Sequence, residues 1–177
     1  AAVAILGGLF SSRLNMNLRE DKHWAYGAYA FLSDALGPRP LMLYAPVQTD
    51  HTADALAELR GELQAYLGDR PPTAEELKKI NDNQIRGLPG QYETAGAVAG
   101  AMLGVLRYQR PANWVAQTKQ RLEAVTVAQT TEAARTHIRP ERLVWLVVGD
   151  LQAIEGPVRE LGLGRVQVLD ESGAVLR

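Results

Sequence analysis

The chain has 177 residues, of which 46% are hydrophobic and 22% charged, and its formal net charge is −1. This composition is typical of a globular domain with a sizeable core and argues against disorder. The balanced charge offers no basic surface for nucleic acid or an anionic membrane. Cysteine is absent, which excludes disulfides, thiol nucleophiles and thiolate metal sites.

The first part of the chain predicts two helices and a pair of strands. Residues 1–6 have the pattern of the last turns of an apolar helix, which a glycine pair then ends. The next helix is expected to start at Ser11 or Ser12, which are both good N-cap residues. A strand is expected over Trp24–Leu32, apolar on both faces, with an antiparallel partner over Leu41–Val47.

The middle of the chain is predominantly helical. Leucines spaced along residues 52–67 form a buried stripe that ends before Gly68. Two sequences of capping-box type mark later helix starts, Thr73 with Glu76 and Thr126 with Gln129. Further helices are expected over residues 93–109 and 111–125, and the helix that begins at Thr126 should end before Pro140.

Three glycines, Gly96, Gly100 and Gly104, are spaced at intervals of four within the predicted helix over residues 93–109. On a helix they form a smooth strip, and each costs roughly 1 kcal/mol relative to alanine. We therefore expect this helix to pack closely against a neighbour, with a hinge as the alternative. The apolar run is shorter than the ~20 residues that a membrane span needs.

The last part of the chain predicts two more strands. Residues Arg142–Asp150 form an unbroken apolar run, which predicts a strand buried on both faces. A short helix is expected next, and residues 165–170 alternate like a final strand. Strands and helices in this order predict an α+β domain, with a mixed, mostly antiparallel sheet covered by helices.

The sequence contains no recognisable catalytic centre of its own. The three histidines, His23, His51 and His137, are too far apart for a His-x-x-x-His or His-x-x-Glu-His zinc pair. A Gly-x-Ser-x-Gly nucleophile motif, a phosphate loop and a dinucleotide fingerprint are also absent. From the pattern alone, Arg19 is a solvated charge at a helix end and Tyr26 is a core residue of a strand.

Two stretches nevertheless resemble a known family. The segment LGGLFSSRLNMNLREDKHWAYGAYAF and the segment from Thr73 to the closing VVGD are similar to the pitrilysin/insulinase family of zinc metallopeptidases. This resemblance implies the mitochondrial-processing-peptidase-like fold, also called the LuxS/MPP-like metallohydrolase fold. It also implies that residues 1–177 form a single domain of the C-terminal type, which lacks its first strand and part of its first helix.

The resemblance implies a role that depends on a partner. Family members have two homologous halves, and the half with the His-x-x-Glu-His motif holds zinc. This chain lacks that motif, so it is similar to the metal-free half, which contributes an arginine and a tyrosine to the substrate site. The matching residues are Arg19 and Tyr26. Such groups could bind a peptide backbone and stabilise the oxyanion that develops at a zinc site.

Several expectations follow from the resemblance. The chain itself should hold no metal or cofactor and should be inactive alone, while zinc belongs to a homologous peptidase domain or subunit that acts with it on a peptide substrate. The alternative is a catalytically silent structural or assembly subunit of the same fold. A self-contained small-molecule site has no support in the sequence, and the resemblance favours the periplasm as the compartment.

Overall fold

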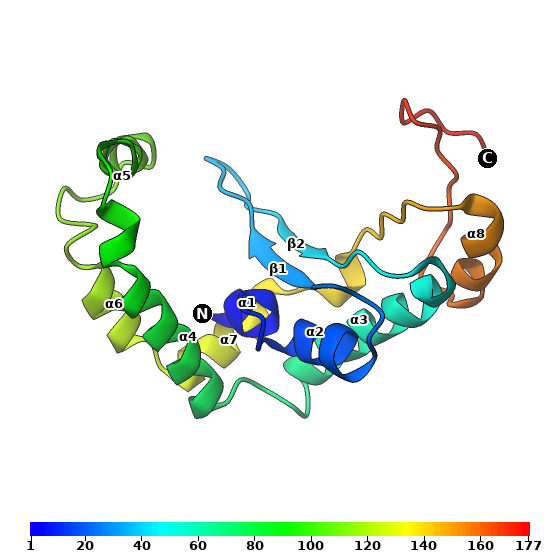
Figure 1. Cartoon of the computed structure of the whole chain (residues 1–177), viewed down its shortest axis with the longest axis horizontal. Helices are drawn as coiled ribbons and strands as arrows, with labels where there is room; N and C mark the ends of the chain where they lie inside the picture. The colour runs from blue at the N-terminus through cyan, green and yellow to red at the C-terminus, as the bar shows by residue number, and fades with distance from the viewer.

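The computed structural model describes all 177 residues, and it has the predicted α+β architecture. Helices lie beneath a short β-hairpin, and an arm of the chain rises on either side of it (Figure 1). The strands are β1 (Tyr29–Leu32) and β2 (Leu41–Tyr44), and the helices are α1 (Ala2–Gly7), α2 (Arg13–Asn15), the π-helix η1 (Met16–Asp21), the 3-10 helix η2 (Thr49–His51), α3 (Thr52–Leu67), α4 (Ala74–Gly87), η3 (Pro89–Tyr92), α5 (Ala95–Arg107), α6 (Thr118–Ala124), α7 (Val127–His137), η4 (Pro140–Arg142) and α8 (Leu151–Glu160).

The hairpin is shorter than the sequence predicts. β1 and β2 pair antiparallel, from Tyr29 opposite Tyr44 to Leu32 opposite Leu41. Before β1 the pairing reduces to one isolated bridge, between Ala25 and Val47. The expected burial of both faces is wrong: Ala30 is buried, whereas the neighbouring Phe31 is exposed. The helices therefore cover one face of the hairpin only.

The core lies between the hairpin and the helices beneath it. Apolar side chains of α1, η1, α3 and α4 meet there, together with two from α7 and the turn after it. α1 packs directly on β1, and Gly7 makes this possible because an added Cβ would lie 2.2 Å from the backbone nitrogen of Ala30. The largest fully buried apolar side chains are those of Tyr66, Ile5, Leu6, Leu14, Leu18 and Leu63.

Local helix signals are largely confirmed. Both capping boxes form: the hydroxyl of Thr73 accepts from the N–H of Glu76, and that of Thr126 accepts from the N–H of Gln129. The helix expected over residues 111–125 is shorter, since its first part forms turns and α6 begins at Thr118. No helix is both long and apolar enough to cross a bilayer.

The glycine strip of α5 does not pack against a neighbour. A Cβ added at Gly96, Gly100 or Gly104 would meet no atom within 4 Å, and α5 has no buried residue. The expectation of close packing is therefore wrong. α5 lies at the outer end of the arm formed by α4, α5 and α6, away from the core (Figure 1).

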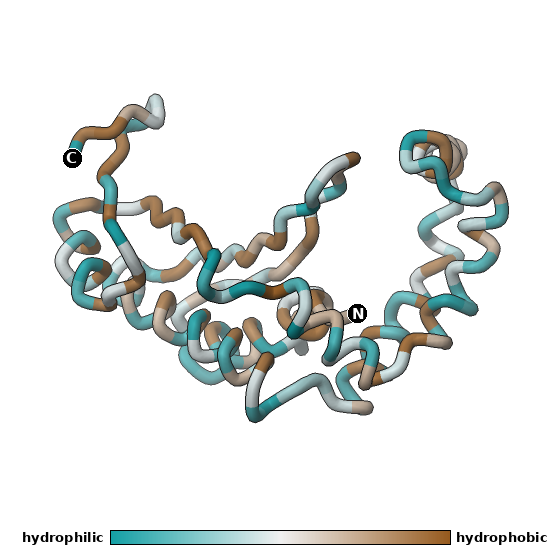
Figure 2. Tube along the Cα trace, turned by 180° about the vertical axis from the view of Figure 1, so that it is seen from behind, coloured by the Kyte–Doolittle hydropathy of each residue, from teal (hydrophilic) through white to brown (hydrophobic).

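The strand predicted over Arg142–Asp150 is also wrong as stated. The segment is extended and leads from η4 to α8, but it forms no ladder with β2 or any other strand. Leu143 and Trp145 pack against the core, whereas Val144, Leu146 and Val148 are almost fully exposed. Figure 2 shows the hydrophobic colouring of this segment along the trace.

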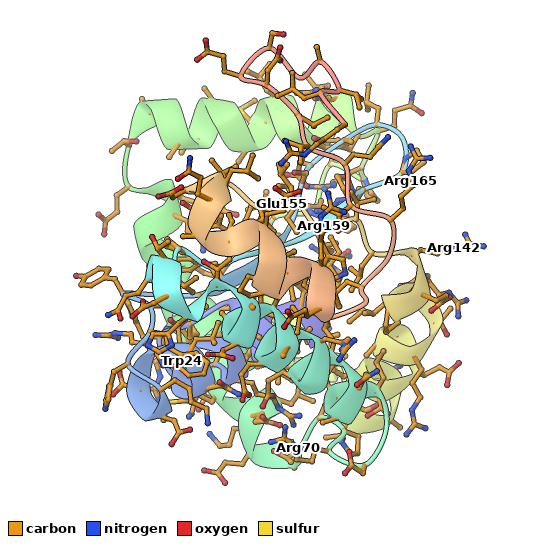
Figure 3. The ribbon with its side chains drawn as sticks, turned by 90° about the vertical axis from the view of Figure 1, so that its right-hand side faces the viewer. Trp24, Arg70, Arg142, Glu155, Arg159 and Arg165 are labelled. Carbon is orange, nitrogen blue, oxygen red and sulfur yellow. The ribbon has the colours of Figure 1, made fainter.

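The final strand predicted over residues 165–170 does not join the hairpin sheet. It folds back on the end of the chain through one bridge, between Leu169 and Val175. Glu155 of α8 holds this tail, because its carboxylate accepts from Arg159 at 2.8 Å and from Arg177 at 2.6 Å. Figure 3 shows Glu155 and Arg159 together on α8. The tail is thus tied to α8 rather than to the sheet.

Candidate functional site

Arg19 lies on the π-helix that continues α2. The N–H of Lys22 donates to the carbonyl of Asn17 at 2.9 Å, which closes the wide turn. Leu18, one residue earlier, is 1% exposed and anchors the turn in the core. Short π-helical turns are rare and often occur at functional sites. The guanidinium of Arg19 consequently lies at the surface, on a turn that Leu18 anchors in the core.

The chain reverses immediately after this turn. His23 has φ of 59°, in the left-handed region, which is uncommon for a residue other than glycine. The N–H groups of Trp24 and Ala25 both donate to the carbonyl of Leu18, at 2.9 and 3.3 Å. This helix end resembles the common left-handed cap. It brings Tyr26 back beside the π-helix.

Asn15 fixes the backbone that follows Tyr26. Its Nδ2 donates to the carbonyl of Ala28 at 2.7 Å, and its Oδ1 accepts from the N–H of Ala28 at 2.8 Å. Nδ2 also donates to the carbonyl of Leu9 at 3.1 Å. Asn15 is fully buried, so these bonds form in a medium where an unpaired polar group is costly. One side chain thus joins the segment before α2, the helix and the start of the hairpin.

The structure brings the two sequence-predicted site residues, Arg19 and Tyr26, together. The guanidinium carbon of Arg19 lies 5.8 Å from the centre of the Tyr26 ring and 4.8 Å from that of Phe10. Both distances suit cation–π contacts. Tyr26 is 83% exposed and its hydroxyl makes no hydrogen bond within the chain, so the expectation from pattern alone that it is a core residue is wrong.

Phe10 was not predicted as a site residue. It is 58% exposed and lies in the turn between α1 and α2. Its contact with Arg19 depends on the turn between α1 and α2, which sequence spacing does not reveal. The only signal in the sequence is a phenylalanine two residues after the Gly7–Gly8 pair that ends the predicted first helix. The site is therefore an open surface cluster of one cation and two aromatic rings, with Glu20 ion-paired to Arg19 at 3.4 Å.

No group of three or more histidine, aspartate or glutamate side chains converges as a metal site. Each of two histidines has a local partner. The Nδ1 of His23 lies 3.0 Å from the carbonyl of Arg19, and the ring of His51 stacks on Trp24 with centroids 4.7 Å apart. The groups at this cluster are one guanidinium and one phenol, which can donate hydrogen bonds, and the guanidinium also carries a positive charge.

A polar cavity of about 690 Å³ is lined by residues of α2, η1 and the start of α4, but it does not include Arg19 or Tyr26. One lining residue, Arg13, is fully engaged: its Nε and Nη2 donate to the carboxylate of Glu76 at 2.6 and 2.7 Å. Arg13 also donates to the carbonyls of Arg70 and Pro71. These contacts join α2 to the start of α4, so the cavity has a structural explanation.

Comparison with known proteins connects this architecture with one family. Residues 1–83 match the family model described as the peptidase M16 inactive domain. No curated protein sequence matches the chain significantly. The crystal structure of the peptidase M16 inactive domain from Pseudomonas fluorescens is similar with a TM-score of 0.68 and 24% identity, covering 78% of this chain and 33% of that chain.

Two further structures give the same result. A protein named as a candidate zinc protease from Bordetella pertussis Tohama I has a TM-score of 0.64 at 24% identity, over 76% of this chain and 73% of that chain. A protease from Helicobacter pylori has a TM-score of 0.64 at 23% identity, over 76% of this chain and 32% of that chain. The chain thus spans about a third of the Pseudomonas and Helicobacter chains.

These similarities confirm the resemblance to the pitrilysin/insulinase peptidases and the α+β fold class. The structural matches, all under 25% identical, establish the fold, and the family model adds the family signature over the part of the chain that contains the cluster. Residues 1–83 match the model of the peptidase M16 inactive domain family, and the chain has the fold of that domain.

Proposed function

We propose that this chain is the metal-free half of a zinc endopeptidase and that it presents Arg19 and Tyr26 to a peptide bound at the zinc of a homologous partner domain. The single observation that supports this role most directly is the adjacency of the two side chains on an exposed surface. Tyr26 is 83% exposed, and the guanidinium of Arg19 lies 5.8 Å from its ring. Buried or separated side chains could not act on a substrate held by another domain.

The chemistry of the pair suits peptide hydrolysis. Attack by zinc-bound water on a peptide carbonyl develops negative charge on the carbonyl oxygen. Arginine carries a permanent charge and several N–H donors, and a free phenol adds another donor. Both can donate to that oxygen or to neighbouring carbonyls without reading the sequence of the peptide. The contacts of Arg19 with the rings of Phe10 and Tyr26 limit its motion, which favours a defined position.

The test is reconstitution with the zinc-bearing domain of the same natural protein. Neither this chain alone nor that domain alone should cleave a fluorogenic peptide, whereas the mixture should. In the mixture, Arg19→Ala and Tyr26→Phe should each lower kcat by about 10²-fold, the size expected for one lost oxyanion donor. Matched controls are Arg86→Ala, an exposed arginine on α4, and Tyr108→Phe at the end of α5; both should keep the wild-type rate.

Wild-type turnover in both Arg19→Ala and Tyr26→Phe would contradict the proposed role. A stable complex with the zinc-bearing domain that cleaves no peptide, even with the wild-type chain, would instead favour the catalytically silent assembly subunit. Far-ultraviolet circular dichroism of each variant confirms that any loss of activity does not come from unfolding.

A further inference from the structure

The helix α5 exposes an apolar face at the outer end of the arm (Figure 1). No charged residue occurs from Ala95 to Leu106, and none of the residues of α5 is buried. Its main neighbour is η3, which directly precedes it in the chain. The exposed fraction is 64% for Met102, 64% for Leu103 and 74% for Leu106. Contiguous exposed apolar surface of this kind indicates contact with another molecule.

The spacing of residues along this face matches the contact line between two packed helices. Ala95, Ala99, Met102 and Leu106 follow one another at intervals of four, three and four residues, and all four are exposed. This is the spacing of the residues that meet when two helices pack side by side along their length. We call these four residues the α5 seam. Its two small side chains lie in the first half of the helix and its two large ones in the second half.

The α5 seam is complementary to a second copy of itself when the two helices run antiparallel. Ala95 of one copy then faces Leu106 of the other. In the same way, Ala99 of one copy faces Met102 of the other. Each large side chain meets a small one, which fills the interface evenly. Parallel copies would instead place alanine against alanine and leucine against leucine, so that one end would be loosely packed.

Opposite charges at the two ends of α5 favour the same direction. Glu93 comes just before the helix and Arg107 is its last residue. Both are exposed, and neither has an ion-pair partner within the chain. In the antiparallel arrangement, Arg107 of each copy lies beside the start of the other helix, next to Glu93. The helix dipoles are also opposed, so the positive end of each helix lies beside the negative end of the other.

We propose that α5 binds α5 of a second copy of this chain, in the antiparallel direction, through the α5 seam. Glu93 of one copy pairs with Arg107 of the other at both ends of the contact. The helix has 13 residues and is about 20 Å long at ~1.5 Å per residue, so the contact is short. Small interfaces are weak, and we expect a dimer that forms at micromolar concentrations and dissociates on dilution. This inference does not depend on the proposed peptidase role.

Sedimentation equilibrium of the 177-residue chain, from low micromolar to several hundred micromolar concentrations, measures the dissociation constant. Leu106→Glu should raise that constant by at least about 100-fold, because each copy would place a charge against the apolar seam. The matched control is Leu36→Glu in the loop of the hairpin, where the leucine is 72% exposed, and it should leave the constant unchanged. A chain that stays monomeric at every concentration, or an equal effect of the two variants, would overturn the proposal.

Charge reversal tests the direction of the two helices. Glu93→Arg and Arg107→Glu should each weaken the dimer by about 10-fold, because both ends then bring like charges together. A mixture of the two variants should recover the wild-type affinity, since each end of the mixed dimer again combines a carboxylate with a guanidinium. A mixture that associates no more tightly than either variant alone would overturn the antiparallel contact.

Hydrogen exchange of α5 separates this occupant from the zinc-bearing domain. The amides of α5 should exchange more slowly as the concentration of the 177-residue chain rises, while those of α3 should not change. Protection of α5 that appears only when the zinc-bearing domain is added would assign this face to that domain and overturn the proposal.

Discussion

At the scale of single residues, the most consequential side chain for the candidate site is Asn15, which touches neither Arg19 nor a substrate. Its amide pairs with both backbone groups of Ala28, two residues after Tyr26. Its position on α2 is fixed by Leu14 and Leu18, which are each 1% exposed. The backbone next to the cluster of Arg19 and Tyr26 is therefore positioned by the buried side chain of Asn15, which buried leucines flank.

Replacing Asn15 with leucine should destabilise the protein. The N–H and carbonyl of Ala28 and the carbonyl of Leu9 would be buried without partners, which we expect to lower the free energy of unfolding by about 3 kcal/mol. Urea denaturation measures this change. The exposed Asn83→Leu is the matched control and should stay within about 0.5 kcal/mol of wild type. An Asn15→Leu protein as stable as wild type would show that water satisfies these groups.

At the scale of elements, α1 approaches β1 more closely than an added Cβ at Gly7 would allow. Gly7 ends α1 where the strand backbone passes, and an added Cβ would lie 2.2 Å from the nitrogen of Ala30 and 2.7 Å from the carbonyl carbon of Tyr29. Backbone atoms of a paired strand cannot move aside as the end of a side chain can. The glycine is thus required for packing rather than for an unusual φ.

Gly7→Ala should therefore be strongly destabilising, by about 3 kcal/mol, because the helix must shift away from the strand. Gly61→Ala is the matched change within α3, where an added Cβ meets nothing within 4 Å. It should stabilise the protein by about 0.5–1 kcal/mol, since alanine favours a helix interior. Thermal unfolding of the two variants should shift the midpoint in opposite directions, and a shift of the same sign in both would contradict this account.

The elements also show which features a sequence can predict. Helix starts depend on a few adjacent residues, and both capping boxes, at Thr73 and Thr126, form as expected. The prediction of a paired strand over Arg142–Asp150 was wrong because a strand needs a partner strand. The hydrophobic pattern of one segment does not show which other segment pairs with it. The prediction that the glycine strip of α5 packs against a neighbour was wrong for a similar reason. A smooth helix face allows close contact, but it does not show that a neighbouring element is present.

The candidate site residues were predicted on a different basis. Arg19 and Tyr26 were identified through the family resemblance, and the structure shows that a π-helical turn and the left-handed His23 make them neighbours. Neither feature is visible in residue spacing. Phe10 was missed because its contact with Arg19 arises only when the turn between α1 and α2 is formed.

At the scale of the whole molecule, an arm of three helices, α4, α5 and α6, extends from a compact body (Figure 1). The apolar attachment consists of Leu77 and Ile80 of α4, which belong to the core. The polar attachment is the paired contact of Arg13 with Glu76, at 2.6 and 2.7 Å. α5 itself exposes Met102, Leu103 and Leu106, so the arm ends in an apolar helix.

The polar attachment makes the stability of the molecule depend on pH. Burial alone would raise the pKa of Glu76, but hydrogen bonds from Arg13 and from Thr73 outweigh it and hold the pKa below its ordinary value of 4.5. A carboxylate with a lowered pKa in the folded state contributes stability that is complete above the unfolded pKa. That contribution is lost as the pH falls through the lower, folded pKa.

Urea denaturation near pH 7 and near pH 3 should therefore separate Glu76→Gln from wild type. Near pH 7 the variant should be less stable, because glutamine cannot form the charge-assisted pair with Arg13. On acidification wild type should lose more stability than the variant, so that the two converge. Glu75→Gln, its exposed neighbour in the same first turn of α4, should follow the wild-type pH dependence. Parallel pH profiles for wild type and Glu76→Gln would mean that the arm is held by Leu77 and Ile80 alone, and that the ion pair merely accompanies this packing.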